Sequence, residues 1–160
     1  MRNDISVGLG EVKVSSNPED ILIAFGLGSC IGVGMYDPIT RIGGMLHAVL
    51  PQSNGKQDSP AKYVDTGIAL LLNQLQKAGA AQSRLIVRIA GGANMLTAPG
   101  MQTFFDIGTR NIEATHNILK KLGLKISCEE VGGQIGRTVR LYIVDGRMTI
   151  RTMGGQEKDM

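Results

Sequence analysis

Apolar residues fall in short stretches along most of the chain, where they alternate with polar residues or run together. This pattern, bounded by glycine, proline, asparagine or aspartate, predicts β-strands. We expect strands at residues 5–14, 21–25, 30–36, 42–50, 84–90, 124–131, 138–144 and 147–152. These stretches are rich in valine and isoleucine, which suit the pleated surface of a sheet.

Two other segments carry apolar residues at the 3.6-residue spacing of an amphipathic helix. The first begins at Ser59 and Pro60, a capping hydroxyl followed by proline at the first helical position, and runs to about Ala78. The second spans about residues 109–122. A glycine follows each segment and is expected to end the helix. Because each apolar stripe lies on one side, each helix is expected to cover one face of a sheet.

Two turns are expected to join neighbouring strands into antiparallel hairpins. Residues 37–40, DPIT, have aspartate and proline at the first two positions of a β-turn. Residues 145–146, DG, are among the strongest short hairpin signals. Much of the sheet is therefore expected to be antiparallel. The fold class that follows is a mixed α/β (α+β) domain, with enough strands for two stacked sheets and a layer of helices.

The composition suits one globular domain, residues 1–160, with a polar tail at about 153–160 that we expect to be frayed. Hydrophobic residues make up 42% and charged residues 19% of the chain, which are ordinary values. Glycine is unusual, because 22 of 160 residues is roughly twice its usual share of about 7%. The glycines cluster at turns, so they mark places where the backbone turns tightly or approaches another group.

The charge pattern argues against nucleic acid as a partner. A net charge of +3 is spread thinly, and three Phe and three Tyr are too few for a base-stacking surface. No apolar run approaches the ~20 residues of a membrane span, and the N-terminus has no signal-peptide core, so we expect a cytoplasmic protein without membrane insertion. Two cysteines and two histidines without paired ligand spacing do not make a closed zinc site, so no metal is expected.

Cys30 is distinctive because it directly follows GLGS, residues 26–29. A two-residue loop at Pro38 and Ile39 would place Cys30 opposite His47 across the hairpin, with Cβ atoms ~4.5–5.5 Å apart. A register shift of two places would make them diagonal neighbours on the same face, whereas an odd shift would separate them. The residue types leave two interpretations of Cys30 open, a packed core residue and a nucleophile.

If the two side chains meet, they can perform acyl transfer. An imidazolium stabilises a neighbouring thiolate and then gives its proton to a leaving amine. Backbone N–H groups around Gly28, Ser29 and Cys30, left approachable by the glycines, can hold the oxyanion of a tetrahedral intermediate. The combination predicts hydrolysis of an amide, an ester or a thioester. Cys128 lies within a regular strand and is expected to be a core residue.

Six motifs in order resemble those of the bacterial chemoreceptor glutamine deamidases, the CheD family. They are GLGSC at 26–30, HAVLP at 47–51, KYVD at 62–65, GGA at 91–93, IGTRN at 107–111 and VGGQIGR at 131–137. The resemblance implies a three-layer α/β/β sandwich similar to the catalytic domain of the cytotoxic necrotizing factor toxins. It also implies a hydrolase that converts selected glutamines of methyl-accepting chemotaxis proteins to glutamate and ammonia, without a metal or organic cofactor.

The resemblance further assigns residues and partners. The family's cysteine and histidine fall on Cys30 and His47, and a common partner is the CheC-type CheY-phosphate phosphatase. The family's threonine, six residues before the cysteine, is Ala24 here. Either a backbone carbonyl or another side chain orients the imidazole instead, or this member is a slower enzyme. Residues 51–60 and 93–108 are expected walls of an open site. Two alternatives remain, a regulatory binding module for that phosphatase with little catalysis, and a thiol peptidase.

Overall fold

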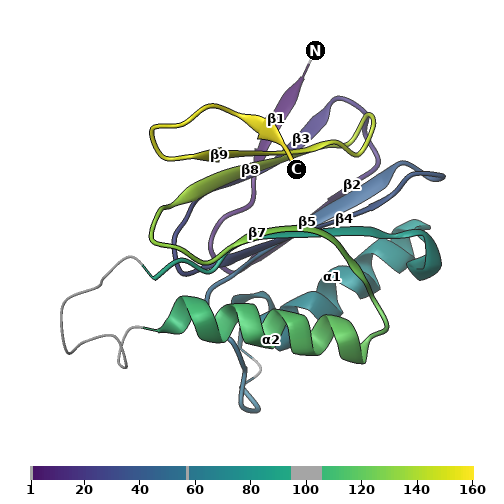
Figure 1. Cartoon of the computed structure of the whole chain (residues 1–160). Coiled ribbons are helices and arrows are strands. Elements are labelled where there is room, and N and C mark those ends of the chain that lie inside the picture. Colours follow the sequence, from purple (N-terminus) through teal and green to yellow (C-terminus); the bar gives the residue numbers. More distant parts are fainter. Residues whose placement is uncertain (1, 57, 95–105) are drawn as a thin grey trace.

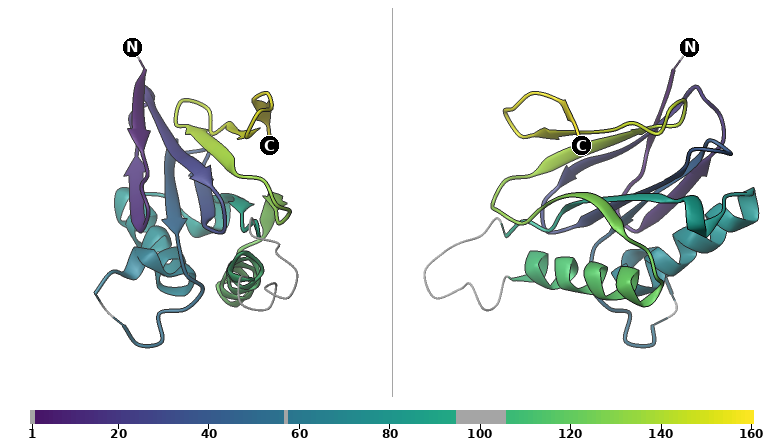
Figure 2. Two further views of the ribbon diagram at one scale, coloured as in Figure 1. Left: turned by 90° about the vertical axis from the view of Figure 1, so that its left-hand side faces the viewer. Right: turned by 45° about the vertical axis from the view of Figure 1, so that its right-hand side comes forward.

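Two five-stranded sheets lie face to face, and two helices cover the far side of one of them (Figure 1). The structure is a computed structural model that describes residues 2–56, 58–94 and 106–160. The sheet between the other two layers is called the middle sheet, and the other is called the outer sheet. The end-on view in Figure 2 shows the sheets as separate layers, with the helices beneath.

The outer sheet contains, in spatial order, β1 (Asn3–Ser6), β3 (Asp20–Leu27), β8 (Arg137–Tyr142), β9 (Met148–Thr152) and β10 (Lys158–Asp159). The middle sheet contains β2 (Glu11–Ser15), β5 (Ile42–Ala48), β4 (Ile31–Asp37), β6 (Ile86–Gly91) and β7 (Ile126–Val131). The helices are α1 (Val64–Ala78) and α2 (Ile107–Lys121), with short 3-10 turns η1 (Pro60–Lys62) and η2 (Gln82–Arg84).

Most neighbouring strands are antiparallel, and only the β1–β3 and β6–β7 pairs are parallel among the described strands. This confirms the predicted fold class, a three-layer α/β/β sandwich with largely antiparallel mixed sheets and two main helices. No helix in the described ranges is long and apolar enough to cross a membrane.

Two apolar clusters hold the three layers together. One lies between the helices and the middle sheet, and the other lies between the two sheets. The middle sheet is covered on both faces, so every residue of β4 and β5 is buried. This explains why residues 30–36 and 42–50 read as nearly continuous apolar runs, since a strand covered on both faces has no solvent side to mark with polar residues.

The single strand expected at residues 5–14 is wrong. The chain forms β1 in the outer sheet, turns at Leu9 and Gly10, and continues as β2 in the middle sheet. Gly10 has a φ of 70°, a left-handed conformation that a residue with a side chain adopts only with strain. Apolar alternation continues through the turn, and it does not reveal that the chain changes layers.

The helix expected from Ser59 begins later. Residues Pro60–Lys62 form the 3-10 turn η1, Tyr63 is extended, and α1 begins at Val64. Its end is as predicted, because Gly79 takes the left-handed conformation with a φ of 115°. Helix α2 lies within two residues of its expected bounds, which is the usual uncertainty of helix ends.

The expectation of a frayed tail at 153–160 is also wrong. The chain reverses after β9 through Gly154, whose φ is 80°, and returns as β10. Lys158 pairs with Ile150, and the Met160 N–H donates to the Met148 carbonyl oxygen at 2.9 Å. The open edge of β9 supplies the unpaired backbone groups that hold the tail, so a polar composition did not prevent an ordered strand.

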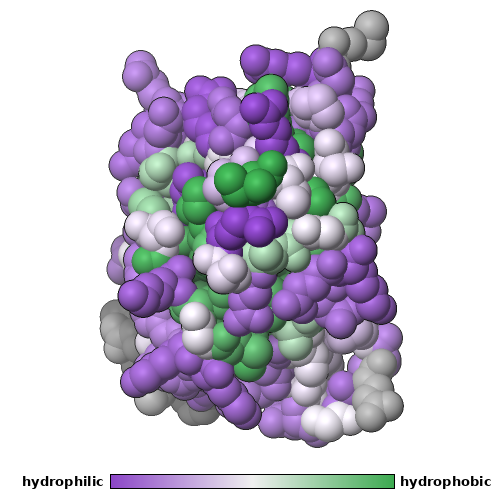
Figure 3. Space-filling model, turned by 90° about the vertical axis from the view of Figure 1, so that its right-hand side faces the viewer, coloured by the Kyte–Doolittle hydropathy of each residue, from purple (hydrophilic) through white to green (hydrophobic). Residues whose placement is uncertain are grey.

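The two ends of the sandwich differ. One end gathers the loop before β4, the segment after β6 and the beginning of α2, and it carries Cys30. The other end carries the β4–β5 and β8–β9 turns. Figure 3 shows that apolar residues on this face are surrounded by polar and charged ones. Ile39 and Val144, on these two turns, are exposed apolar residues.

Candidate active site

The GLGSC segment connects the outer sheet to the middle sheet, from the end of β3 to the start of β4. Two of its carbonyl groups accept hydrogen bonds from the segment after β6. The Ala93 N–H donates to the Gly28 carbonyl oxygen and the Gly92 N–H donates to the Cys30 carbonyl oxygen, each at 2.8 Å. These contacts explain why the GGA motif accompanies the GLGSC motif, since only a close backbone approach allows them.

The orientation of these carbonyl groups determines where the N–H groups point. In a trans peptide, the carbonyl of one residue and the N–H of the next point in opposite directions. Because the Gly28 and Ser29 carbonyls point toward the segment after β6 and toward α2, the N–H groups of Ser29 and Cys30 point away from them. Within the described ranges, neither N–H donates a hydrogen bond to another backbone group. The arrangement favours an oxyanion site at the N–H groups of Ser29 and Cys30, within the predicted set around Gly28, Ser29 and Cys30.

His47 lies on β5 and is almost fully buried, with 4% of its surface exposed. Its Nδ1 is 2.9 Å from the carbonyl oxygen of Val7. A carbonyl oxygen only accepts, so Nδ1 carries the ring proton and Nε2 presents a lone pair. Nε2 is buried and has no hydrogen-bond partner among the described residues. Burial lowers the pKa of His47 more than the contacts with Val7 and Glu11 raise it, so the ring is a neutral base at neutral pH.

The Val7 carbonyl orients the His47 ring, the role left open by the alanine at position 24. Ala24 is fully buried and offers no hydroxyl group. The Val7 N–H donates to the Ile23 carbonyl oxygen at 2.7 Å, which brings the Val7 backbone beside Ala24. Its carbonyl then reaches His47 from there. Of the two possibilities, a backbone carbonyl or another side chain, the structure shows the backbone carbonyl, supplied by the segment that crosses between the sheets.

The β4–β5 hairpin has a different register from the predicted one. Asp37 pairs with Ile42 across a four-residue loop, so Gly32 rather than Cys30 lies opposite His47. The direct cross-strand contact was therefore a wrong prediction. The register differs by two places, which keeps Cys30 and His47 on the same face as diagonal neighbours, the second possibility considered above.

Both side chains face the space between the two sheets. Cys30 packs against the apolar cluster between the sheets, and Met45, two residues before His47 on β5, belongs to that cluster. Gly32 contributes no side chain between the ring and the thiol. No hydrogen bond joins Cys30 Sγ to His47 Nε2 within the described chain. Catalytic hydrogen bonds in enzymes without substrate are often long and shorten only in the complex.

The thiol of Cys30 is half-buried, and burial raises its pKa, while its own backbone N–H lowers it to a smaller extent. A thiol with a raised pKa beside an imidazole with a lowered pKa is a neutral pair at rest. Both shifts favour a neutral thiol and a neutral imidazole over the preformed thiolate–imidazolium pair suggested by the residue types.

Asn111 is a site residue that the sequence reasoning missed. It lies on the buried side of α2 with 0% exposure, and its Nδ2 donates to the Ser29 carbonyl at 2.8 Å and to the Val49 carbonyl at 3.0 Å. One side chain thus joins the loop before Cys30 to the chain just after His47. A signal was available, because Asn111 precedes Thr115 by one helical turn on the inward stripe, and a buried amide needs partners.

The expected walls of the site are described in part. Residues 51–56 and 58–59 form a largely exposed polar loop, tied to α1 where the N–H of the buried Ser53 donates to the Asp65 carboxylate at 3.1 Å. Residues 95–105, which include most of the other expected wall, lie outside the described ranges.

Comparisons with known proteins agree with one another. A family model described as CheD chemotactic sensory transduction matches residues 49–152. A probable chemoreceptor glutamine deamidase CheD of Symbiobacterium thermophilum is 44% identical over 97% of this chain and 96% of its own length. The chemoreceptor glutamine deamidase CheD of Thermotoga maritima is 43% identical over 95% of this chain and 94% of its own.

Among solved structures, the chain is similar to that of the hypothetical protein YfiH of Bacillus licheniformis, with a TM-score of 0.48 and 13% identity over 74% of this chain and 49% of that one. The family model covers more than half of the chain, and the curated relatives extend the similarity over nearly all of it, including the segments that carry Cys30 and His47. The chain therefore belongs to the CheD family.

Proposed function

We propose that this protein is a chemoreceptor glutamine deamidase, a hydrolase that converts the side-chain amide of selected receptor glutamines to a carboxylate and releases ammonia. The names of the curated relatives support this activity and substrate. The structural observation that carries it is the state of His47. Its Nε2 is a buried lone pair, fixed by the Val7 carbonyl, on the same face as the Cys30 thiol.

The first half of the reaction forms a thioester. His47 Nε2 takes the thiol proton while Sγ of Cys30 adds to the carboxamide carbon, and the carbonyl electron pair moves onto oxygen. The N–H groups of Ser29 and Cys30 donate to that oxyanion. The C–N bond then breaks, and His47 returns its proton to the leaving nitrogen, so that ammonia departs and an acyl group remains on Cys30.

The second half hydrolyses the thioester. His47 takes a proton from water, whose oxygen adds to the acyl carbon, and the same N–H groups hold the second oxyanion. The C–S bond breaks, Cys30 regains its proton from His47, and glutamate is released. Water is the only co-reactant, so the proposal requires neither a metal nor an organic cofactor.

Cytoplasmic location is part of the proposal. Cys30 and Cys128 are both free thiols, which suits a reducing compartment. A CheC-type CheY-phosphate phosphatase is the proposed regulatory partner, and this assignment rests on the resemblance of the motifs alone. In a binding module for that phosphatase, the lone pair of His47 would have no task, so we prefer the enzyme.

The test is mass spectrometry of a purified chemoreceptor cytoplasmic fragment, incubated with the protein in water enriched in heavy oxygen. A deamidase adds one solvent oxygen to each converted glutamine and leaves the receptor chain intact. Cys30→Ala should abolish the change, while the matched variant Cys128→Ser should retain it. Cleavage of the receptor chain would indicate a peptidase, and no change with the unmodified protein would refute the deamidase.

A further inference from the structure

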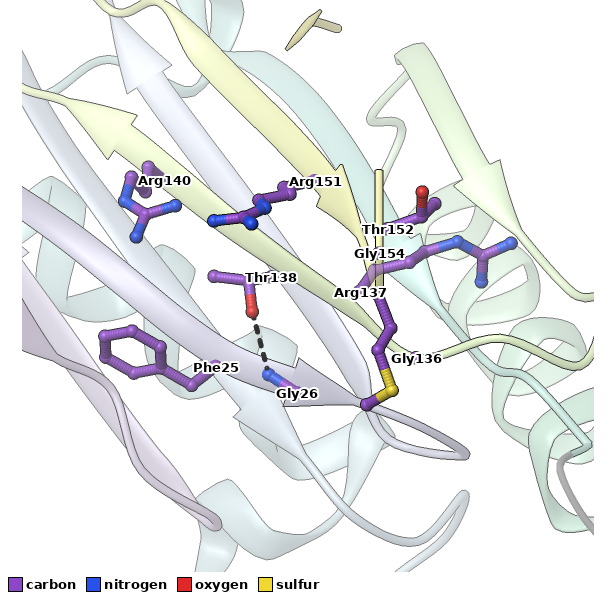
Figure 4. Close-up of a pocket in the computed structure, with 10 residues that line it drawn as sticks. Phe25, Gly26, Gly136, Arg137, Thr138, Arg140, Arg151, Thr152 and Gly154 are labelled. Carbon is purple, nitrogen blue, oxygen red and sulfur yellow. Dashed lines mark hydrogen bonds between the residues drawn. The ribbon is translucent and has the colours of Figure 1, made fainter. Parts of the chain in front are cut away.

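A groove of about 300 Å³ lies on the exposed face of the outer sheet, at the end of the sandwich that carries Cys30 (Figure 4). We call it the arginine groove. Its lining includes Phe25 and Gly26 from β3, Arg137 and Arg140 from β8, Arg151 from β9, and Met153 from the following turn. Nothing in the proposed chemistry uses it.

Strand register places two of the arginines side by side. Thr138 pairs with Arg151 and Arg140 pairs with Thr149, so Arg140 and Arg151 are diagonal neighbours on one face. Figure 4 shows their guanidinium groups on the same side of the sheet as Phe25 and Thr138. The positive charges of Arg140 and Arg151 repel each other. A bound partner that carries negative charge would offset this repulsion.

The three arginines have few acidic partners within the molecule. Arg140 lies over the Phe25 ring at 6.0 Å, Arg151 Nε donates to the Gly155 carbonyl at 3.1 Å, and Arg137 donates to the Gly91 carbonyl at 3.2 Å. Among the described residues, none of the three forms a salt bridge. Two acids act on the arginines. Glu130 acts on Arg137 through its charge, and Glu157, near Arg140, accepts hydrogen bonds from Thr149 and Tyr142. The pKa of Glu157 is lowered first by the hydrogen bond from Thr149, then by that from Tyr142, and to a smaller extent by the charges of Arg140 and Arg147.

The lining indicates the chemistry of the occupant. Guanidinium groups bind carboxylates through paired hydrogen bonds. Phe25 and Met153, 54% and 75% exposed, add apolar surface beside the arginines. An open groove that is both basic and apolar fits a polypeptide segment that carries acidic and apolar side chains better than it fits a small anion.

The groove lies close to the candidate nucleophile along the chain. Gly26 lines the groove, its N–H donates to Thr138 Oγ1 at 3.1 Å, and Cys30 follows four residues later. Four residues span at most about 14 Å. A substrate segment covers that distance with about four residues if extended, or about nine if helical at ~1.5 Å per residue.

We propose that the arginine groove binds an acidic segment of the protein substrate, within about nine residues of the glutamine that reaches Cys30. The groove thereby selects glutamines that have carboxylates nearby. This inference rests on the proposed deamidase function.

The test compares Arg140→Gln/Arg151→Gln with Lys77→Gln/Lys120→Gln, which removes two exposed charges from the helical layer. Loss of charge-assisted hydrogen bonds should raise KM for the receptor fragment at least about tenfold and leave kcat unchanged. A short neutral glutamine peptide, which does not reach the groove, should be hydrolysed equally by all variants. The lysine variant should behave as the unmodified protein, and thermal melting should show that all variants are folded.

Substitution of receptor Glu and Asp residues near the target glutamine completes the test. These substitutions should raise KM for the unmodified protein and have little further effect on the arginine variant, because the two changes remove the same contact. Unchanged KM in the arginine variant, or equal losses with the neutral peptide, would overturn the proposal. Competition by single-stranded DNA at the groove, stronger than by an acidic peptide, would also overturn it.

Binding of the Cys30→Ala protein to the receptor fragment separates this proposal from the enzyme proposal, because it needs no turnover. Arginine-dependent binding without deamidation by the unmodified protein would preserve the groove and refute the deamidase. Deamidation by the unmodified protein, with binding that does not depend on the arginines, would support the deamidase and refute the role of the groove.

Discussion

Asn111 Nδ2 donates a hydrogen bond to the carbonyl oxygen of Ser29 at 2.8 Å, and this contact attaches helix α2 to the loop before Cys30. A second bond from the same nitrogen, to the Val49 carbonyl at 3.0 Å, attaches the chain that leaves β5. One buried amide thus adds to the β4–β5 pairing in fixing the segments that carry the thiol and the imidazole.

Replacement of Asn111 should therefore affect both stability and turnover. Asn111→Ala removes the donor from two carbonyl groups and should lower the free energy of unfolding by about 1–3 kcal/mol. It should also lower kcat more than tenfold, while an exposed neighbour variant, Asn117→Ala, should change neither value. Urea denaturation and deamidation assays measure the two effects. A variant with reduced stability but an unchanged kcat would show that the bridge does not position the site.

Removal of the base from His47 can be separated from loss of its hydrogen bond. His47→Asn retains an amide N–H near the position of Nδ1, so the bond to Val7 can persist, but no lone pair replaces Nε2. We expect a loss of about 10²–10⁴-fold in kcat. Circular dichroism should show a folded protein. Substantial activity in this variant would indicate that another group is the base.

Acid pH should reveal the lowered pKa of His47. An unfolded histidine binds a proton near pH 6.5, but the folded one binds it only at lower pH. Between these two values the unfolded state binds more protons, so stability is full above about pH 6.5 and falls as pH falls through this window. The acid limb of kcat/KM should likewise lie below about pH 6.5. Profiles of His47→Asn should lack the histidine contribution to stability, and an acid limb above pH 7 would contradict the assignment.

Alkylation of Cys30 should report a neutral resting thiol. Because burial raises its pKa, the rate of reaction with iodoacetamide should increase with pH beyond about 8.5, the ordinary value of a free cysteine. The measurement is made in a Cys128→Ser background, so that only Cys30 reacts. A rate that is already constant below pH 7 would instead indicate a preformed thiolate.

Replacement of Gly91 tests whether its close packing against the Cys30 backbone is needed for stability and turnover. A Cβ at Gly91 would collide with the Cys30 carbonyl oxygen. The φ of Gly91 is 106°, which a residue with a side chain adopts only with strain. Gly91→Ala should destabilise the fold by about 2–4 kcal/mol and sharply lower kcat. Gly123→Ala is the matched control, since Gly123 also has a positive φ, 74°, but has no atom within 4 Å of its added Cβ. If Gly91→Ala and Gly123→Ala reduce stability and turnover to the same extent, backbone strain rather than displacement of Cys30 is responsible.

Local patterns predicted most of the elements correctly. Strands β4 and β5 were expected at residues 30–36 and 42–50 and lie at Ile31–Asp37 and Ile42–Ala48. Hydrophobic period, turn residues and terminal glycines act over a few positions, so the sequence displays them directly. The prediction of one strand at residues 5–14 was wrong because apolar and polar residues continue to alternate while the chain passes from one sheet to the other.

The candidate site was predicted in its residue types but not in its geometry. Cys30 and His47 share a face as expected, yet the hairpin loop has four residues, because the Asp37 carboxylate accepts the N–H groups of Ile39 and Thr40 and lengthens the turn. That side chain is in turn held by Arg84, far along the chain. The Asp37 side chain in this turn is thus held partly by a residue outside the hairpin sequence.

The sequence by itself determined the helices, most strands, the family and the two residues proposed for catalysis, because these depend on local pattern and on motifs. Only the tertiary structure decided the state of the site. The Val7 carbonyl that sets the proton on His47 is 40 positions away, and Asn111 is 82 positions from Ser29. Contacts at such separations arise when sheets and helices pack into layers, and packing is a property of the whole chain rather than of any segment.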